Sequence, residues 1–179
     1  MDFIAMDFET ANRQRASACS LAIVVVEHDQ VTDSFYTLIN PETDFEPQNI
    51  RIHGIRPAMV ADAPTFPAVW PHIQTFFTPQ RLVTAHNSPF DVSVLRRTLE
   101  RYDLAVPQYQ VIDTAKTAKR LMPELPNHRL DTVSAALNIP LAHHHHALAD
   151  SYACARILLA QASAFGPQAL RPLLKLTAA

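Results

Sequence analysis

The sequence predicts an α/β fold in which a mixed sheet is flanked by helices. Residues 2–39 have the pattern of three strands with short connections, and the rest of the chain alternates strands with helices. Strands in succession, followed by strands in alternation with helices, are typical of a mixed sheet covered by helices. The chain has 179 residues, 48% of them hydrophobic, which is enough for one globular domain with a sizeable core.

The amino-terminal part of the chain predicts an antiparallel meander. Residues 2–9 alternate as a strand does, and residues 19–27 are β-branched and apolar enough to form a buried central strand. Residues 31–39 have the pattern of a third strand, which follows the second after a short turn. Because hairpin-linked strands pair antiparallel, we expect these three strands to form a meander.

The middle of the chain predicts a long connection followed by a strand and a helix. Residues 40–66 are rich in Pro, Asp and Asn, and we expect a loop there with a short helix near 56–61. Apolar side chains at helical spacing predict a helix within 67–77. Residues 81–86 are expected to form a strand, and residues 89–103 the helix after it.

The carboxyl-terminal part predicts one short strand and then helices only. The strand is expected near 109–112, and the helices at about 113–121, 129–138 and 146–163, with a last short helix within 167–176. Pro123 and Pro126 separate the first two of these helices. We therefore expect one domain over residues 1–165, with residues 166–179 forming a tail or short helix packed on it.

Composition and charge exclude several classes of protein. Fifteen Lys and Arg against seventeen Asp and Glu give a net charge of −2, which is not the strongly basic balance of a protein that coats long duplexes. The amino terminus lacks the basic flank and long apolar centre of a signal peptide, and the longest aliphatic run, residues 21–26, is too short to span a bilayer. Cys19 and Cys154 lie in apolar patterns without metal-ligand spacing, as in a reducing compartment. We expect a cytoplasmic protein with no membrane partner.

Asp7 and Glu9 are the first candidate functional residues. Side chains two residues apart on a strand point to the same side, so both carboxylates project together from an otherwise apolar strand. Paired acids repel one another unless a cation lies between them, and Mg²⁺ prefers oxygen ligands of this kind. The alternative is a strand end that emerges into solvent with two hydrated acids.

Asp91 is the second candidate. Ser88 is a suitable N-cap, Pro89 occupies the first helical position, and Asp91 falls in the first turn of the same helix. An acid at that position complements the helix dipole without any further function. A functional role therefore requires a partner site elsewhere in the chain.

Asp150 is the third candidate. It lies among Ala, Leu, Tyr and Cys on an otherwise apolar helix, where a carboxylate is costly to bury unless it is paired or bound to metal. The alternatives are a position at the solvent edge of the helix, or a surface contact with His146 four residues before it.

Taken in order, the three segments resemble a known family. DFETAN at 7–12, AHNSPFD at 85–91 and HHALADSYACARIL at 145–158 resemble the three motifs of DnaQ-like 3′–5′ exonucleases of the DEDDh branch, to which the proofreading subunit epsilon of DNA polymerase III belongs. IHGI at 52–55 and VIDTAKTAKRL at 111–121 are also similar. The resemblance covers residues 1–160, and the ordered set is far more specific than any one motif.

The resemblance implies an RNase H-like fold with a mixed five-stranded sheet, and a nuclease mechanism. It implies that Asp7, Glu9, Asp91 and Asp150 hold two Mg²⁺ or Mn²⁺ ions and that His145 is the general base. Two metal ions roughly 4 Å apart activate the attacking water and stabilise the leaving 3′ oxygen. A histidine that is neutral near pH 7 can take the proton from that water. Of the four consecutive histidines at 143–146, only His145 has the five-residue offset from Asp150 of the family motif.

The resemblance also implies the substrate and the residues around it. The substrate is a nucleic acid with a free 3′ end, single-stranded or frayed DNA, from which nucleoside 5′-monophosphates are released one at a time. The residues expected to contact or enclose the terminal nucleotide are Phe8, Thr10, Ala11, His53, Asn87 and Phe90. For His53 the alternative is a histidine that only caps its own loop. A DNA polymerase or repair protein is a possible partner.

Two further functions remain open at this point. An exoribonuclease of the same branch would share every motif, because the residue that reads the 2′-OH cannot be identified. A non-catalytic module that binds nucleic-acid ends or a polymerase would be expected to lack one or more carboxylates or the histidine, and all five are present.

Overall fold

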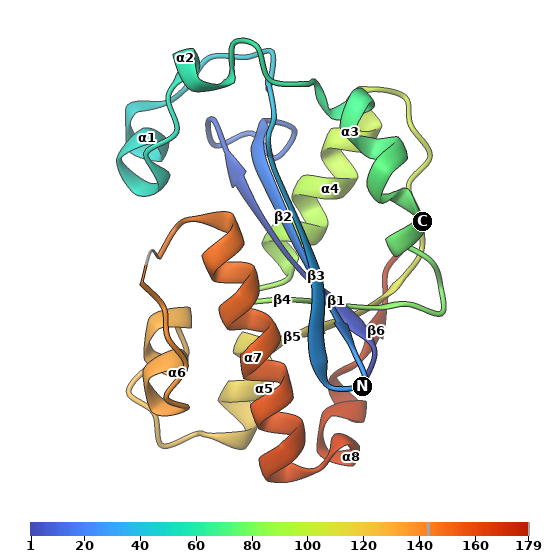
Figure 1. Ribbon diagram of the computed structural model, residues 1–179, viewed down its shortest axis with the longest axis vertical. Helices are drawn as coiled ribbons and strands as arrows, with labels where there is room; N and C mark the ends of the chain where they lie inside the picture. Colours follow the sequence, from blue (N-terminus) through green and yellow to red (C-terminus); the bar gives the residue numbers. More distant parts are fainter. Residues whose placement is uncertain (143, 179) are drawn as a thin grey trace.

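The protein is built around one mixed sheet with helices on both faces. The computed structural model describes residues 1–142 and 144–178 (Figure 1). The six strands lie in the order β3-β2-β1-β4-β5-β6. Their bounds are β1 Phe3–Thr10, β2 Ala18–Glu27, β3 Gln30–Leu38, β4 Leu82–Ala85, β5 Gln110–Asp113 and β6 Lys175–Leu176. The expected mixed α/β class and the antiparallel β1-β2-β3 meander are confirmed.

The second half of the sheet is parallel. β4 pairs parallel with β1, and β5 pairs parallel with β4, so the carboxyl ends of these three strands lie at the same edge of the sheet. β1 is the longer partner: its pairing with β2 extends to Thr10, whereas its pairing with β4 ends at Ala5. The last residues of β1 therefore have β2 on one side and no strand on the other.

Helices occupy the connections. Before β4 lie α1 Pro47–His53, α2 Pro57–Val60, α3 Phe66–Ile73 and the 3₁₀ helix η1 Gln74–Phe76. After β4 come α4 Pro89–Arg101, α5 Thr114–Leu121, α6 Leu130–Ala136 and the long α7 Ala147–Phe165. α1 was not expected from the sequence, because Pro47 at its start and Gly54 at its end leave only two turns between them.

The carboxyl terminus contains the main departure from the expected fold. The expected short helix ends early: α8 is Pro167–Leu170, the 3₁₀ helix η2 is Arg171–Leu173, and β6 then pairs antiparallel with β5. The sheet therefore has six strands and not five. Pro172 has no backbone N–H to continue an α-helix, and the open edge of β5 supplies the hydrogen bonds instead.

The alternation of β1 divides the core between the two faces of the sheet. Ile4, Met6 and Phe8 belong to the cluster that α3 and α4 cover. Phe3 and Ala5 belong to the cluster that α7 covers, so Asp7 and Glu9 continue the α7 side of the strand (Figure 1). β1 is thus apolar on both faces along its pairing with β4, and one face becomes acidic beyond the end of that pairing.

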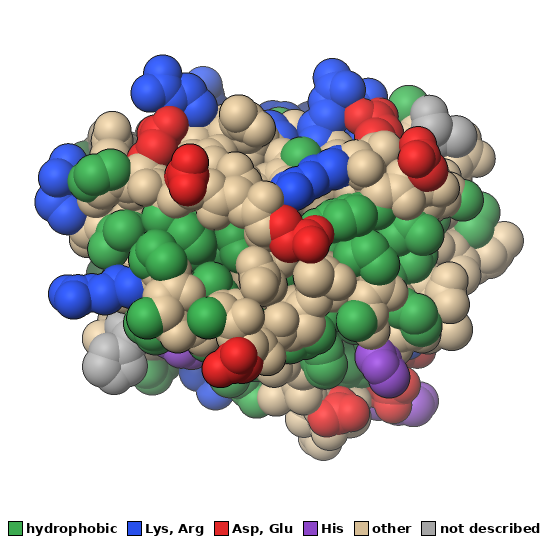
Figure 2. All heavy atoms as spheres, turned by 90° about the horizontal axis from the view of Figure 1, so that it is seen from above, with side chains coloured by type: hydrophobic (Ala, Val, Ile, Leu, Met, Phe, Trp, Pro, Cys, Tyr) green, Lys and Arg blue, Asp and Glu red, His purple; other side chains and the backbone are tan. Residues whose placement is uncertain are grey.

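Figure 2 shows one face of the molecule, on which Lys and Arg side chains alternate with Asp, Glu and hydrophobic ones. No continuous basic surface is present on that face, in agreement with the net charge of −2. Within residues 1–142 and 144–178, none of the helices has the length and apolar character required to cross a membrane.

Candidate active site

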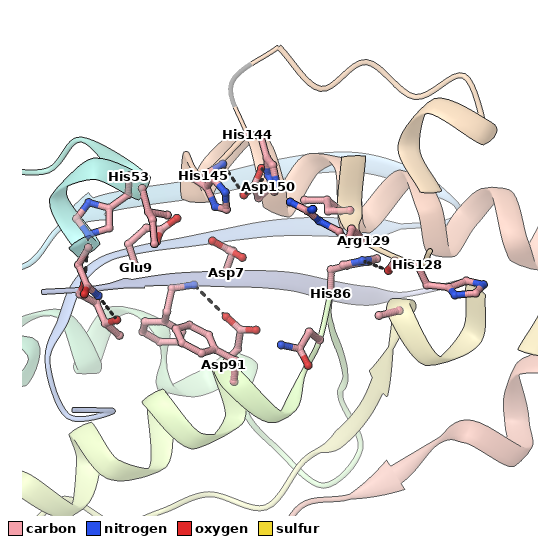
Figure 3. A pocket seen from close by; sticks show the side chains of 18 residues that line it. Asp7, Glu9, His53, His86, Asp91, His128, Arg129, His144, His145 and Asp150 are labelled. Carbon is pink, nitrogen blue, oxygen red and sulfur yellow. Dashed lines mark hydrogen bonds and ion pairs between the residues drawn. The ribbon is translucent and has the colours of Figure 1, made fainter. Parts of the chain in front are cut away.

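The site begins at the unpaired end of β1. Asp7 and Glu9 project from it on the α7 side, as the two-residue spacing predicts (Figure 3). Ligand oxygens of Asp7, Glu9 and Asp150 all lie within 4.8 Å of one another, although residues 9 and 150 are far apart in the chain. The two acids are thus clustered with a third acid from a distant part of the chain.

Asp91 joins the site through a contact with β1. It lies in the first turn of α4 and is 1% exposed, and its Oδ1 accepts a hydrogen bond of 3.0 Å from the Phe8 N–H. Ser88 precedes the helix without a side-chain capping bond. Asp91 is thus more than a residue that complements the helix dipole, because it connects α4 to the strand that carries Asp7 and Glu9.

Asp150 enters from the first turn of α7. It is 5% exposed, and its Oδ2 accepts a hydrogen bond of 2.9 Å from the His145 backbone N–H. The His144 Nδ1 lies 3.3 Å from the same oxygen. Among the described contacts, the Asp150 side chain makes no bond to the His146 side chain, although the helical spacing would allow one. The His146 ring instead stacks on Tyr36, with ring centroids 5.0 Å apart.

The four carboxylates and His145 line one pocket of about 570 Å³. Of the residues expected to contact substrate, Phe8, Thr10, His53, Asn87 and Phe90 also line it. The structure does not bring Ala11 there, so Ala11 is removed from the expected set. Its side chain is fully buried against Cys19 and Ile55, and its N–H and C=O are bonded to Ser17 and Glu46.

The acids raise one another's pKa. Burial, followed by the neighbouring Asp91 and Glu9, raises the pKa of Asp7 well above its usual value. Burial and Asp150 raise the pKa of Glu9 to about 8, and burial also raises that of Asp91 to about 8. Burial raises the pKa of Asp150 as well, against the effect of His144. The charged forms of these side chains are thus destabilised until a cation compensates them.

His145 lies in the turn before α7. Its φ is 67°, in the left-handed region, and it precedes His146, the N-cap of the helix. Burial, followed by the neighbouring His144, lowers the pKa of the His145 imidazole. The ring therefore stays neutral at lower pH than a free histidine does. His143 lies outside the described residues.

His53 lines the pocket with both ring nitrogens engaged. Its Nε2 donates to the Thr10 carbonyl at 3.1 Å, and its Nδ1 accepts from the Ile55 N–H at 3.0 Å. Burial lowers the pKa of His53, in spite of the hydrogen bond to Thr10. These two bonds fit the alternative of a histidine that caps its own loop, although the residue also lines the pocket.

Several lining residues were not found from the sequence. They are Asn49, Ile52, His86, Ala115, His128, Arg129, Leu130 and His144. Arg129 is the single Lys or Arg among the lining residues that the structure describes. The place of His86 within the second motif is the one signal that could have indicated it. Its Nε2 donates to the His128 carbonyl and its Nδ1 accepts from the Thr114 hydroxyl, both at 2.9 Å.

The donor set suits a hard divalent cation. Among the described residues, neither the Asp7 nor the Glu9 carboxylate has a hydrogen bond or an ion pair, and with Asp150 they form a compact group of oxygen ligands. Mg²⁺ and Mn²⁺ bind such groups and leave positions for water and phosphate. The acidic cluster is therefore compatible with a metal site.

Comparison with known protein families shows to which family the chain belongs. The family model described as exonuclease, RNase T, matches residues 4–158. The chain belongs to this exonuclease family. The match confirms the resemblance to DnaQ-like exonucleases that the ordered motifs carry, and it makes the acid-lined pocket the candidate active site of the exonuclease.

Individual relatives agree with this result. The chain is 31% identical over 160 residues to the DNA polymerase III PolC-type of Caldanaerobacter subterraneus subsp. tengcongensis, and 34% identical over 158 residues to that of Oceanobacillus iheyensis. These matches cover 88% and 87% of this chain but 11% of each relative. The chain thus spans about a tenth of the length of those polymerases.

Solved structures share the whole fold. Exonuclease X, in complex with 5′ overhanging duplex DNA, is 26% identical with a TM-score of 0.77, and the match covers 96% of this chain and 98% of that one. E. coli exonuclease I, in complex with a dA16 oligonucleotide, has a TM-score of 0.79 at 20% identity, over 96% of this chain and 42% of that one. The second likeness shows the fold alone.

Proposed function

We propose that this exonuclease is a magnesium- or manganese-dependent 3′–5′ exonuclease that hydrolyses the terminal phosphodiester bond of single-stranded or frayed DNA. Its products would be nucleoside 5′-monophosphates. The observation that carries the proposal is the convergence of Asp7, Glu9, Asp91, Asp150 and His145 on one pocket. The exonuclease domain would comprise residues 1–165, with residues 166–179 as a segment packed on it.

The four carboxylates would hold two cations. When bound, the ions would activate the attacking water and stabilise charge on the leaving 3′ oxygen. Asp7 and Glu9 lie between the other two acids, since Asp91 approaches from α4 and Asp150 from α7 (Figure 3). This arrangement supports a two-ion site. Among the described residues only Asp150 of the four has an ion-pair partner, His144, and four ionised acids so close together require more than one positive charge in compensation.

His145 would accept the proton of the attacking water. Its lowered pKa keeps the ring able to accept a proton near pH 7, and its backbone bond to Asp150 holds it beside the carboxylates. The ring itself makes no hydrogen bond to the carboxylates among the described contacts, so it is available to a water molecule in the pocket.

The pocket supports a strand end as the substrate. Its volume of about 570 Å³ lies within the range of sites for small ligands. Phe8, Ile52 and Phe90 supply apolar surface for a base, and Thr10 and Asn87 supply polar groups. DNA is favoured because exonuclease X was solved with overhanging duplex DNA, and the polymerase relatives support a polymerase or repair protein as a partner.

Arg129 would bind a phosphate of the substrate strand. It is the one Lys or Arg among the described lining residues, and its side chain is 70% exposed beside the pocket with only a weak contact of 3.9 Å to Asp131. A guanidinium pairs with phosphate through two parallel hydrogen bonds. We expect Arg129→Ala to raise KM several-fold with a small effect on kcat, and Arg129→Lys to recover part of the loss, in steady-state assays at two salt concentrations.

Oligonucleotides labelled at one end test the function. We expect 3′-labelled single-stranded DNA to release labelled mononucleotide at once and 5′-labelled DNA to shorten stepwise, in Mg²⁺ or Mn²⁺ but not in EDTA. Matched RNA and a circular single strand complete the set. Faster degradation of RNA would make the protein an exoribonuclease, and nicking of the circle would contradict the exonuclease polarity. Cleavage by metal-stripped protein in EDTA would contradict the two-ion mechanism.

A further inference from the structure

The histidine run before α7 places two imidazoles side by side in the pocket. The rings of His144 and His145 stack with centroids 3.9 Å apart and an angle of 19° between their planes. Consecutive side chains of an extended chain point to opposite sides, but His145 has a φ of 67° and the turn brings both rings to one side (Figure 3). His146 does not join them, because it stacks on Tyr36.

Asp150 brings a carboxylate to the same place. The His144 Nδ1 is 3.3 Å from Asp150 Oδ2 and 3.4 Å from Oδ1, and the His145 N–H holds Oδ2 at 2.9 Å. Ligand atoms of His144, His145 and Asp150 all lie within 4.8 Å of one another. Two imidazoles and one carboxylate that line the pocket therefore lie close enough to bind one ion after a small rotation of the stacked rings.

This donor set differs in kind from the group formed by Asp7, Glu9 and Asp150. Oxygen-only groups suit Mg²⁺ and Mn²⁺, whereas imidazole nitrogens favour Zn²⁺. Zn²⁺ binds three protein ligands of the His/His/carboxylate kind and keeps a fourth position for water. Asp150 belongs to both groups, so an ion held by the two histidines would share this carboxylate with the acidic group.

We propose that His144, His145 and Asp150 form a Zn²⁺ site whose occupation inhibits the exonuclease. Binding of Zn²⁺ occupies a ring nitrogen of His145, which then cannot accept a proton from water. It would also place a second cation on the Asp150 carboxylate, next to the acidic group of Asp7 and Glu9. The inhibition rests on the proposed function, whereas the binding of the metal does not.

A direct binding measurement tests the site without nuclease activity. Metal-stripped protein is titrated with Co²⁺, which absorbs strongly in the visible range in a four-coordinate nitrogen-containing site and weakly in a six-coordinate oxygen site. We expect a strong absorption band that Zn²⁺ abolishes and excess Mg²⁺ does not, and we expect His144→Gln to lack it. His146→Gln is the matched control, since His146 stacks on Tyr36, and it should keep the band. Absence of the band in the unaltered protein, or its persistence in His144→Gln, would overturn the proposal.

A Zn²⁺ titration of the Mg²⁺-dependent activity tests the consequence. Each variant is normalised to its own rate without Zn²⁺. We expect His144→Gln to require at least about tenfold more Zn²⁺ for half-inhibition, as for other losses of metal-site contacts, and His146→Gln to match the unaltered protein. Equal Zn²⁺ sensitivity of all three proteins would place the inhibitory ion among the oxygen ligands and refute the site. If no variant had nuclease activity, the proposed function would fail while the Co²⁺ titration still decided the metal site.

Discussion

Acidic side chains near the carboxyl ends of β1 and β5, the two strands that flank β4, have opposite environments. Asp113, at the end of β5, is 5% exposed and its Oδ1 accepts hydrogen bonds from the N–H groups of Asn87 and Ala115, both at 3.0 Å. It also accepts a longer bond from the Lys116 N–H, and its Oδ2 lies 3.5 Å from the Lys116 Nζ. Asp7 and Glu9, at the end of β1, have no such bond among the described residues.

Burial of an acid does not by itself mark an active site. The charge of Asp113 is compensated by a helix start and a lysine, so it serves the fold. Asp7 and Glu9 are held among further acids, and their raised pKa values show that the chain leaves their charge uncompensated. The uncompensated group is the one whose charged form an added cation would stabilise.

The largest expected effect comes from removing an acid of the uncompensated group. We expect Asp7→Asn to lose nearly all Mg²⁺-dependent nuclease activity while the folded structure is kept, because the substituted amide is a poor ligand for the metal. In EDTA the same variant should melt at a higher temperature than the unaltered protein, since one of several repelling charges is gone. Activity assays and thermal melts with and without Mg²⁺ measure both effects.

Asp91→Ala and Asp150→Ala should lose activity as Asp7→Asn does. Near-normal turnover in any one of these three folded variants would remove that residue from the metal site. A lower melting temperature of Asp7→Asn in EDTA would show that Asp7, like Asp113, serves the fold.

The next effect concerns the base beside the acids. We expect His145→Ala to lower the single-turnover rate at saturating Mg²⁺ by on the order of 10²–10⁴, the usual cost of a lost general base, with metal binding retained. His144→Ala and His146→Ala should each cost less than about tenfold, because neither has the position of the base. If His146→Ala were crippled and His145→Ala were not, the assignment of the base within the run would be wrong.

A smaller effect is expected from the compensated acid. Asp113→Ala removes the N-cap of α5 and leaves the Asn87 N–H without its partner. We expect the free energy of unfolding to fall by about 1–3 kcal/mol. Denaturant titration measures this change. Turnover of Asp113→Ala at low temperature should fall much less than that of Asp7→Asn. If Asp113→Ala lost all activity but kept its full stability, Asp113 would belong with Asp7 and Glu9 and not with the acids that serve the fold.

The smallest effect is the pH dependence of the metal-free fold. The pKa values of Glu9 and Asp91 are raised to about 8, above the value of about 4 for an unfolded acid, so the folded state binds more protons. The contribution of these two protonated acids to the free energy of unfolding is fully present below about pH 4, and it is lost as the pH rises through about 8. In EDTA we therefore expect the melting temperature to fall between about pH 5 and about pH 8.5, and less steeply in Asp91→Asn.

Magnesium should reverse that fall, and more strongly at the higher pH, because metal binding displaces the protons. Thermal melts at several pH values, with EDTA or with Mg²⁺, make the comparison. A melting temperature in EDTA that rises over this range would mean that the acids at the end of β1 are compensated in the way that Asp113 is.

Local regularities made much of the molecule predictable. The period of two in β1 placed Asp7 and Glu9 on one side, and the Ser88-Pro89 pair marked the start of α4 to the residue. The ordered motifs then indicated the family, which the family model confirms. These features depend on backbone stereochemistry within a few residues, or on residue order, and both can be predicted from the sequence.

Other features depend on contacts between segments that are distant in the chain, and local sequence patterns do not reveal them. The Phe8 N–H binds Asp91 across 83 positions of the chain, and this contact brings α4 to β1. Ala11 is buried although its neighbour Thr10 lines the pocket, because the loop folds back to Ser17 and Glu46. The residues after Pro172 pair with the edge of β5, which local propensity does not reveal.

Residue order and strand alternation are thus enough to predict which acids belong together, the side of β1 on which two of them lie, and the family. Which acids are left without compensation was decided by the tertiary structure. Asp7 and Asp113 both end strands of the same sheet, yet only Asp113 meets a helix start and a lysine. The compensation of a buried charge depends on every group within a few ångströms, and in a folded chain most of those groups come from distant segments.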